Sequence, residues 1–104
     1  MAKNFRTPCD DVQDLLKSKG INVVPSNEWE VGKTYLTLGL DGWCYPCVVY
    51  TTYLGIESKG EHKGMFIFES EGITMVVNSE DLYNNTIANR LALKNACKLV
   101  ISKG

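Results

Sequence analysis

An amphipathic pattern near the N-terminus predicts the first element, a helix over residues 8–19. Thr7 suits the N-cap position, Pro8 suits the first helical position, and Gly20 suits the end of the helix. Apolar residues recur at helical spacing within this range: Val12, Leu15 and Leu16. The apolar stripe is narrow, which favours packing against a sheet over burial inside a helical bundle.

The middle of the chain is rich in β-branched and aromatic residues, which predicts strands. We expect strands over the ranges 21–24, 34–38, 48–56, 65–68 and 73–77. Hairpin turns are indicated at Asp41 and Glu71, each of which is followed by glycine. Polar loops are expected at 26–33 and 57–63. Because strands joined by short turns run in opposite directions, the sheet should be antiparallel.

A second helical pattern lies toward the C-terminus. Ser79 starts a helical signal that two asparagines interrupt, and Thr86 is the next candidate cap. Apolar residues then predict a helix over about 86–98. Residues 99–101 fit either the end of this helix or a closing strand, because so short an apolar run has no decisive period.

The order of helix, four or five strands and helix predicts an α+β fold. Residues 1–6 are expected to form a flexible tail, and residues 7–104 a single domain of ordinary size. We expect either a small antiparallel sheet or an SH3-like β-barrel, with an N-terminal helix and a C-terminal helix. The long β-rich run over 48–56 is what favours the barrel, since it suits a strongly bent strand.

Composition and charge narrow the classes of function. The formal net charge is −1, so the chain has no basic excess of the kind that dominates phosphate binding, and a nucleic-acid partner is disfavoured. No apolar run approaches the length that spans a bilayer, and residues 1–6 lack the apolar core of a signal peptide. We therefore expect a cytoplasmic protein without a membrane partner, with its thiols reduced.

The sharpest local motif is a Cys-x-x-Cys pair, Cys44 and Cys47, preceded by Trp43. It resembles the active-site motif of thioredoxins, in which the N-terminus of a helix lowers the pKa of the first thiol. The resemblance implies a thiol–disulfide oxidoreductase, with Cys44 as nucleophile and Cys47 as the resolving thiol.

The surroundings of this pair argue against a thioredoxin fold. Residues 48–53 are all β-branched or aromatic, and such a run costs about 3 kcal/mol in helix propensity relative to alanine. A strand is therefore expected after Cys47. No proline follows Pro46, although thioredoxin-like folds place a cis-proline later in the chain. On an extended strand, Cα atoms three residues apart lie about 10 Å apart, too far for a disulfide.

A metal site is the second chemical hypothesis for the cysteines. A structural zinc ion needs four ligands, and a Cys-x-x-Cys pair supplies only two of them. The remaining candidates are scattered singly along the chain: Cys9, His62 and Cys97. We therefore expect no metal and no cofactor, and no catalytic residues unless the cysteine pair is redox-active. His62 is expected to be exposed in a charged loop.

Aromatic residues in the β-rich half are the better candidates for contacts with a partner. Exposed aromatic side chains near the Asp41 turn would suit a protein segment or a single-stranded nucleic acid. The candidate binding-surface residues are Trp43, Tyr45, Tyr50 and Tyr53. Tyr50 and Tyr53 point to opposite faces of a regular strand, so at most one of them belongs to the core.

These observations favour a small non-enzymatic binding module whose partner is another protein. Its size and lack of catalytic signals are typical of a phage or mobile-element accessory protein that acts on a host partner. Exposed sheet edges would also allow a homodimer through strand pairing. Two alternatives stay open: a thiol–disulfide oxidoreductase that uses Cys44 and Cys47, and a single-stranded nucleic-acid binder. The balance is against an enzyme.

Overall fold

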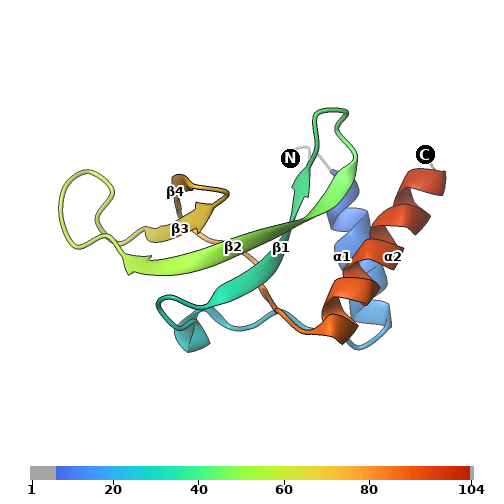
Figure 1. Ribbon diagram of the computed structural model, residues 1–104, viewed down its shortest axis with the longest axis horizontal. Coiled ribbons are helices and arrows are strands. Elements are labelled where there is room, and N and C mark those ends of the chain that lie inside the picture. Colours follow the sequence, from blue (N-terminus) through green and yellow to red (C-terminus); the bar gives the residue numbers. More distant parts are fainter. Residues whose placement is uncertain (1–6, 104) are drawn as a thin grey trace, which may run out of the picture. The chain divides into compact units, whose positions relative to one another are not determined.

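The computed structural model describes residues 7–103 of the 104-residue chain, and this part contains two helices, five strands and a 3₁₀ turn (Figure 1). In chain order these are α1 (Pro8–Ser18), η1 (Ser26–Glu28), β1 (Thr34–Leu40), β2 (Pro46–Ile56), β3 (Phe66–Ser70), β4 (Ile73–Val77), β5 (Tyr83–Asn84) and α2 (Ile87–Lys103). The predicted α+β class is confirmed. The expected tail, residues 1–6, lies outside the described residues.

The described strands form one antiparallel sheet in the order β4-β3-β2-β1-β5. β4 and β5 stand at its two ends and do not pair with each other, so the sheet is open. Of the two expected architectures, the small antiparallel sheet is present, with one helix before it and one after it in the chain. The SH3-like β-barrel is not confirmed, because a closed barrel needs its outer strands to pair.

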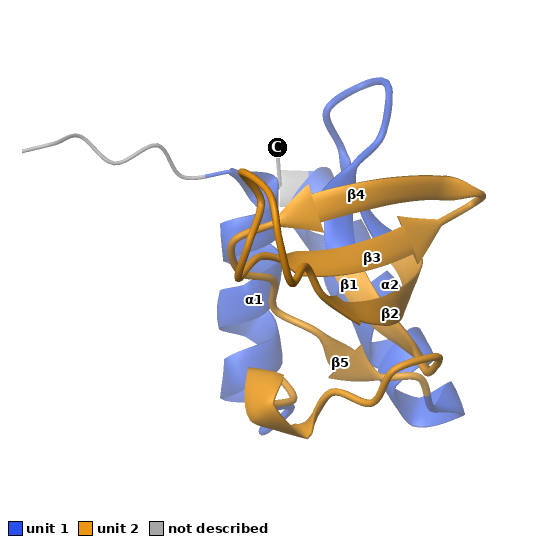
Figure 2. Cartoon of the chain, turned by 90° about the vertical axis from the view of Figure 1, so that its left-hand side faces the viewer, with its two compact units in different colours: residues 1–22, 38–48, 86–104 blue, residues 23–37, 49–85 orange. Residues whose placement is uncertain are grey.

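The chain divides by contacts into two compact units, shown in Figure 2. Unit 1 comprises residues 1–22, 38–48 and 86–104, and holds both helices together with the tip of the β1–β2 hairpin. Unit 2 comprises residues 23–37 and 49–85, and holds the rest of the sheet. β1 and β2 pass through both units. The single domain expected over residues 7–104 stays a prediction.

α1 begins and ends close to the predicted residues. The backbone N–H of Thr7 donates to the Asp10 carboxylate over 2.8 Å and satisfies a group at the helix start. Gly20, with a φ of 82°, follows the last turn, which stops one residue earlier than predicted. Val12 and Leu16 are fully buried, as the apolar spacing indicates.

α2 starts at its predicted cap and continues further than predicted. The hydroxyl of Thr86 accepts a hydrogen bond from the backbone N–H of Asn89 at 3.1 Å. Residues 99–101 belong to the helix and do not form a strand. Within unit 1, α1 and α2 lie side by side and run in opposite directions (Figure 1). The buried residues of α2 are Leu93, Ala96 and Cys97.

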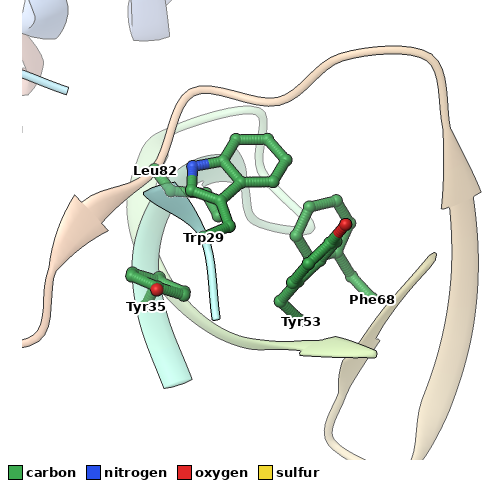
Figure 3. Close-up of a cluster of buried hydrophobic side chains, with 5 residues drawn as sticks. All are labelled: Trp29, Tyr35, Tyr53, Phe68 and Leu82. Carbon is green, nitrogen blue, oxygen red and sulfur yellow. The ribbon is translucent and has the colours of Figure 1, made fainter. Parts of the chain in front are cut away.

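The core of unit 2 is an aromatic cluster built around Trp29, with Tyr35, Tyr53, Phe68 and Leu82 (Figure 3). The Trp29 ring meets the rings of Tyr53 and Phe68 edge-on, with centroids 5.5 and 5.4 Å away. Such edge-to-face contacts are favourable because the positive ring edge meets a negative ring face. The predicted loop over 26–33 is therefore fixed to the sheet by one buried side chain.

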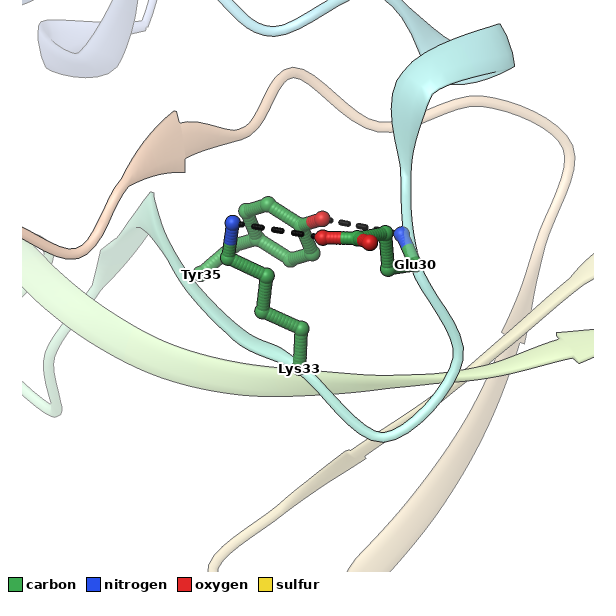
Figure 4. Close-up of polar contacts among 3 residues, drawn as sticks. All are labelled: Glu30, Lys33 and Tyr35. Atoms are coloured by element: carbon green, nitrogen blue, oxygen red, sulfur yellow. Dashed lines mark hydrogen bonds and ion pairs between the residues drawn. The ribbon is translucent and has the colours of Figure 1, made fainter.

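Polar groups around Tyr35 complete this attachment (Figure 4). The backbone N–H of Glu30 donates to the Tyr35 hydroxyl over 2.9 Å, which gives the buried phenol a partner. The Lys33 ammonium lies 5.5 Å from the centroid of the Tyr35 ring and 3.5 Å from the Glu30 carboxylate. The loop before β1 thus carries both apolar and polar contacts to the strand.

The strand predicted over residues 21–24 is wrong. Only Val24 pairs, in an isolated bridge in which its N–H donates to the Leu82 carbonyl over 2.7 Å. Pro25 follows immediately and has no N–H with which to extend a ladder. The chain instead turns into η1.

The helical start predicted at Ser79 is also wrong. The segment after it pairs as β5, in which Tyr83 lies opposite Leu36 of β1. Tyr83 is buried, and burial, followed by the charge of Asp81, raises the pKa of Tyr83 to about 12. Pairing with β1 and burial of these side chains outweigh the weak local helical signal.

The β3–β4 hairpin is confirmed. Glu71 and Gly72 form its two-residue turn with φ values of 53° and 81°, the positive values that a type I′ turn requires. Ser70 and Ile73 are partners on either side of the turn, and the pairing continues to Phe66 opposite Val77. This register fixes which side chains of β4 share a face.

β2 is irregular near its end, between Tyr53 and Gly55, where its register against β3 shifts. Gly55 has a φ of 126°, which L-residues rarely adopt. On the other side of β2, the Tyr53 carbonyl accepts from the Gly32 N–H over 2.7 Å, and the Tyr53 N–H donates to the Lys33 carbonyl over 3.1 Å. Tyr53 lies just before this shift, on the same side of β2 as buried Thr51, and faces the aromatic cluster.

Glu80 is a half-buried acid attached to β1. The Thr37 hydroxyl donates to the Asp81 carbonyl over 2.9 Å and to the Glu80 carboxylate over 3.3 Å. Burial raises the pKa of Glu80, and the hydrogen bonds from Thr37 and the backbone of Asp81 oppose this shift in part. The charged form of Glu80 therefore destabilises the fold relative to the neutral form.

We predict that the two tryptophans differ sharply in their effect on stability. Trp29→Ala should lower the free energy of unfolding by about 3–5 kcal/mol, because it empties the centre of the aromatic cluster. Trp43→Ala is the matched control, since Trp43 is 82% exposed, and it should change stability by less than about 0.5 kcal/mol. Guanidinium unfolding followed by circular dichroism measures both, and equal losses would contradict this core.

We predict that Glu80→Gln stabilises the protein at neutral pH. The folded pKa of Glu80 is raised above its ordinary value of 4.5. The wild type should therefore lose stability as the pH rises from 4.5 through the folded pKa. The amide still accepts from Thr37 and does not titrate, so the variant should gain over the wild type across this window. Thermal unfolding at a series of pH values tests this, and parallel pH profiles would refute it.

Candidate functional site

The loop between β1 and β2, residues 41–45, is held together by hydrogen bonds around Asp41. Its N–H donates to the Tyr45 carbonyl over 2.9 Å, and its own carbonyl accepts from the Cys44 N–H at 3.0 Å. Its carboxylate oxygen Oδ1 accepts from the backbone N–H groups of Trp43 and Tyr45 at 2.8 and 3.0 Å. These bonds fix the backbone on which the aromatic side chains stand.

The four aromatic residues predicted to form a binding surface differ in their location and exposure. Trp43 and Tyr45 are 82% and 50% exposed in this loop of unit 1. Tyr50 is exposed but belongs to unit 2. Tyr53 is wrong as a surface residue, because it faces the aromatic cluster on the same side of β2 as buried Thr51 and is only 6% exposed. The prediction that at most one of Tyr50 and Tyr53 is buried is confirmed.

A cleft of ≈ 740 Å³ lies next to the loop, within unit 1. Three segments that are distant in the sequence line it: α1, the loop with the start of β2, and the end of α2. Its apolar lining residues are Pro8, Leu15, Pro46, Val100 and Ile101. Its polar lining residues are Asp11, Asp14, Ser18, Cys44 and Tyr45. The site therefore joins one exposed aromatic ring of the loop to an apolar hollow beside the helices.

The charged side chains among the described residues that line the cleft are both acidic. Asp11 and Asp14 are three residues apart on α1, a spacing that places both on one helix face. Both are exposed, and no lysine or arginine is among the described residues that line the cleft. A bound group that carries positive charge would meet a favourable potential there.

Cys44 and Cys47 lie in different environments. Cys44 is exposed in the loop with a φ of 63°, and Cys47 is half-buried near the start of β2. A strand runs on from Cys47, as predicted, where the thioredoxin motif would continue into a helix. Within residues 7–103, neither of these cysteines forms a disulfide.

Cys97 interacts with two other cysteines, Cys47 and Cys9, although the three are scattered along the sequence. It is 5% exposed, on the buried side of α2. Burial, and then the thiols of Cys47 and Cys9, raise the pKa of Cys97 to about 11. The Cys9 thiol donates to the Gly39 carbonyl over 3.5 Å. A raised thiol pKa means little thiolate at neutral pH, so this group is unsuited to nucleophilic chemistry.

Three further observations concern His62, metal binding and membrane-spanning helices. His62 is exposed in the predicted loop, which belongs to unit 2. In the part of the chain that the structure describes, no three His, Cys, Asp or Glu side chains are arranged so that they could hold a metal ion. Neither described helix combines the length and apolar character that crossing a lipid bilayer requires.

Comparison with protein-family models, with curated proteins and with solved structures finds no significant match to this chain. The expected partner, phage or mobile-element origin and cytoplasmic location stay predictions.

Only part of the cleft is indicated by the sequence. Cys44 and Tyr45 are among the predicted residues, but the contributions of both helices are not, because three separate segments meet only in the folded chain. One local signal is present, since Asp11 and Asp14 share an exposed helix face. That signal is equally typical of an ordinary solvated helix.

We predict that the thiols differ in accessibility in the folded protein. Iodoacetamide should modify exposed Cys44 at least about 100-fold faster than Cys97, because a thiol of pKa about 11 is roughly 0.1% ionised at pH 8. After unfolding in guanidinium, the two rates should converge. Peptide mass spectrometry over time measures both, and equal rates in the folded protein would contradict the placement of Cys97.

Proposed function

We propose that the protein is a non-enzymatic binding module that takes a segment of another protein into the cleft of unit 1. The observation that carries this proposal is the cleft itself, beside a hydrogen-bonded loop that exposes Trp43 and Tyr45. Its volume of ≈ 740 Å³ lies in the usual range for binding sites in proteins.

The loop supports this proposal because its conformation is already set. Tyrosine and tryptophan dominate the binding energy of many protein interfaces, since each buries a large area with few rotatable bonds. Asp41 holds the backbone at Trp43 and Tyr45 through two hydrogen bonds to its carboxylate. A partner then loses less free energy to ordering of the loop.

The charge of the cleft indicates what the partner segment carries. Asp11 and Asp14 favour lysine or arginine, and the apolar lining favours an aliphatic or aromatic side chain. We therefore propose a segment that presents one apolar side chain next to a basic residue. The acidic lining repels phosphate groups, which makes nucleic acid a poorer occupant. The strand after Cys47 weighs against the oxidoreductase alternative.

Selection from a peptide library tests this proposal and requires no choice of partner. Random twelve-residue peptides selected on the immobilised full chain should be enriched in Lys or Arg beside an aliphatic or aromatic residue. Tyr45→Ala should weaken the binding of a selected peptide at least about 10-fold, as expected for a central aromatic contact. Asp11→Asn with Asp14→Asn should weaken it about 5-fold and reduce its dependence on salt.

Two further variants control this experiment. Tyr50→Ala removes a tyrosine that is exposed in unit 2 and should leave the affinity unchanged. Asp41→Ala keeps every cleft side chain but removes the two loop hydrogen bonds, so it should weaken binding while leaving the fold intact by circular dichroism. Selected peptides without basic residues, whose affinity survives Tyr45→Ala, would overturn the proposal.

A further inference from the structure

β4 is an edge strand without the usual protection. Natural sheet edges are commonly short, charged, interrupted by proline or covered. β5, at the other end of the sheet, has only two residues. β4 has five residues, Ile73–Val77, with no charge and no proline. Three of its apolar side chains are exposed, namely Ile73 (64%), Met75 (38%) and Val76 (38%).

The register of the hairpin shows which backbone groups of β4 are available. In an antiparallel pair, partners that exchange hydrogen bonds alternate with partners that do not, and a two-residue turn is flanked by a bonded pair. Ser70 and Ile73 flank the turn, so Ile73, Met75 and Val77 direct their backbone groups to β3. The N–H and C=O of Thr74 and Val76 therefore point away from the sheet.

These outward groups are arranged symmetrically about Met75. If a second β4 lies antiparallel with a two-fold axis at Met75, Thr74 of each copy stands opposite Val76 of the other. Each such pair exchanges two hydrogen bonds, so four bonds form and all the outward groups of Thr74 and Val76 are satisfied. Met75 then faces its own counterpart as a non-bonded pair, in which the side chains approach most closely.

The side chains of β4 suit the same arrangement. Met75 and Val77 share the face of Phe66 and Phe68, where Val77 packs against the aromatic cluster. A second copy would extend this face and cover the exposed part of Met75. Beyond the strand, Glu71 would lie opposite Ser79 of the other copy, so no like charges meet along the pairing.

We propose that β4 is a homodimer interface, in which the β4 strands of two copies pair antiparallel about Met75. The partner is a second copy of this chain because the outward backbone groups and apolar side chains of β4 are self-complementary about one axis. The residues of this surface belong to unit 2 and those of the cleft to unit 1, and the two proposals rest on different observations, so either can fail without the other.

Proline at an outward N–H position gives a selective test. Val76→Pro removes an N–H that the β3–β4 ladder does not use, and edge strands tolerate proline at such positions. Val76→Thr is the matched control, since it keeps the N–H and the β-branched shape. By sedimentation velocity, the wild type and Val76→Thr should form dimers, and Val76→Pro should raise the dissociation constant at least about 10-fold. Circular dichroism should show the same fold in all three.

A cysteine cross-link tests the register and does not depend on the proline variant. In a Cys44→Ser background, Met75→Cys should form a disulfide-linked dimer under mild oxidation, because non-bonded partners have Cα atoms about 4.5 Å apart. Ile73→Cys is the control, since it should lie about 13 Å along the strand from its own counterpart. It should not cross-link, although Ile73 is more exposed than Met75.

Two results would overturn this proposal. One is a wild-type protein that sediments as a monomer at concentrations up to about 1 mM, because a specific dimer, even a weak one, should have a dissociation constant below this concentration. The other is cross-linking of Ile73→Cys at the same rate as Met75→Cys, which would mean that the copies do not meet in this register. Peptide binding by the cleft is measured separately and leaves both outcomes unaffected.

Discussion

Burial of the Trp29 indole is the interaction on which unit 2 depends. Trp29 comes from a loop, yet its ring meets residues from β2 and β3, and its N–H donates to the Val24 carbonyl over 2.9 Å. One side chain therefore joins segments that local pairing alone would leave independent. Two further hydrogen bonds lie around this buried centre: the Val24 N–H donates to the Leu82 carbonyl, and the Glu30 N–H donates to the Tyr35 hydroxyl.

Local signals were enough to predict α1, the start of α2 and the β3–β4 hairpin. Caps, turn residues and apolar spacing act over a few residues, so α1, the start of α2 and the Glu71 turn followed from sequence. The short strand β5 and the burial of Tyr53 did not, because each depends on a partner distant in the chain. The cleft could not be predicted from the sequence for the same reason, because its lining residues come from three separate segments.

The cysteines show that the structural surroundings of a thiol matter more for its chemistry than the sequence motif in which it occurs. Cys44 and Cys47 have the spacing of a redox pair, but a strand follows them and their exposures differ. Cys97, whose pKa is raised to about 11, has no motif around it and sits on the buried side of a helix. Its altered thiol follows from burial and neighbouring thiols, which no local pattern encodes.

In the Asp41 loop, the residue that fixes the backbone conformation is different from the residues that present their side chains to solvent. Within the described part of the chain, the Asp41 carboxylate accepts hydrogen bonds from the backbone N–H groups of residues 43 and 45, and these bonds do not depend on the side chains at those positions. The left-handed backbone at Cys44 is the one added restriction, since it favours glycine or asparagine among replacements. The side chains at positions 43 and 45 can therefore change while the loop keeps its backbone conformation.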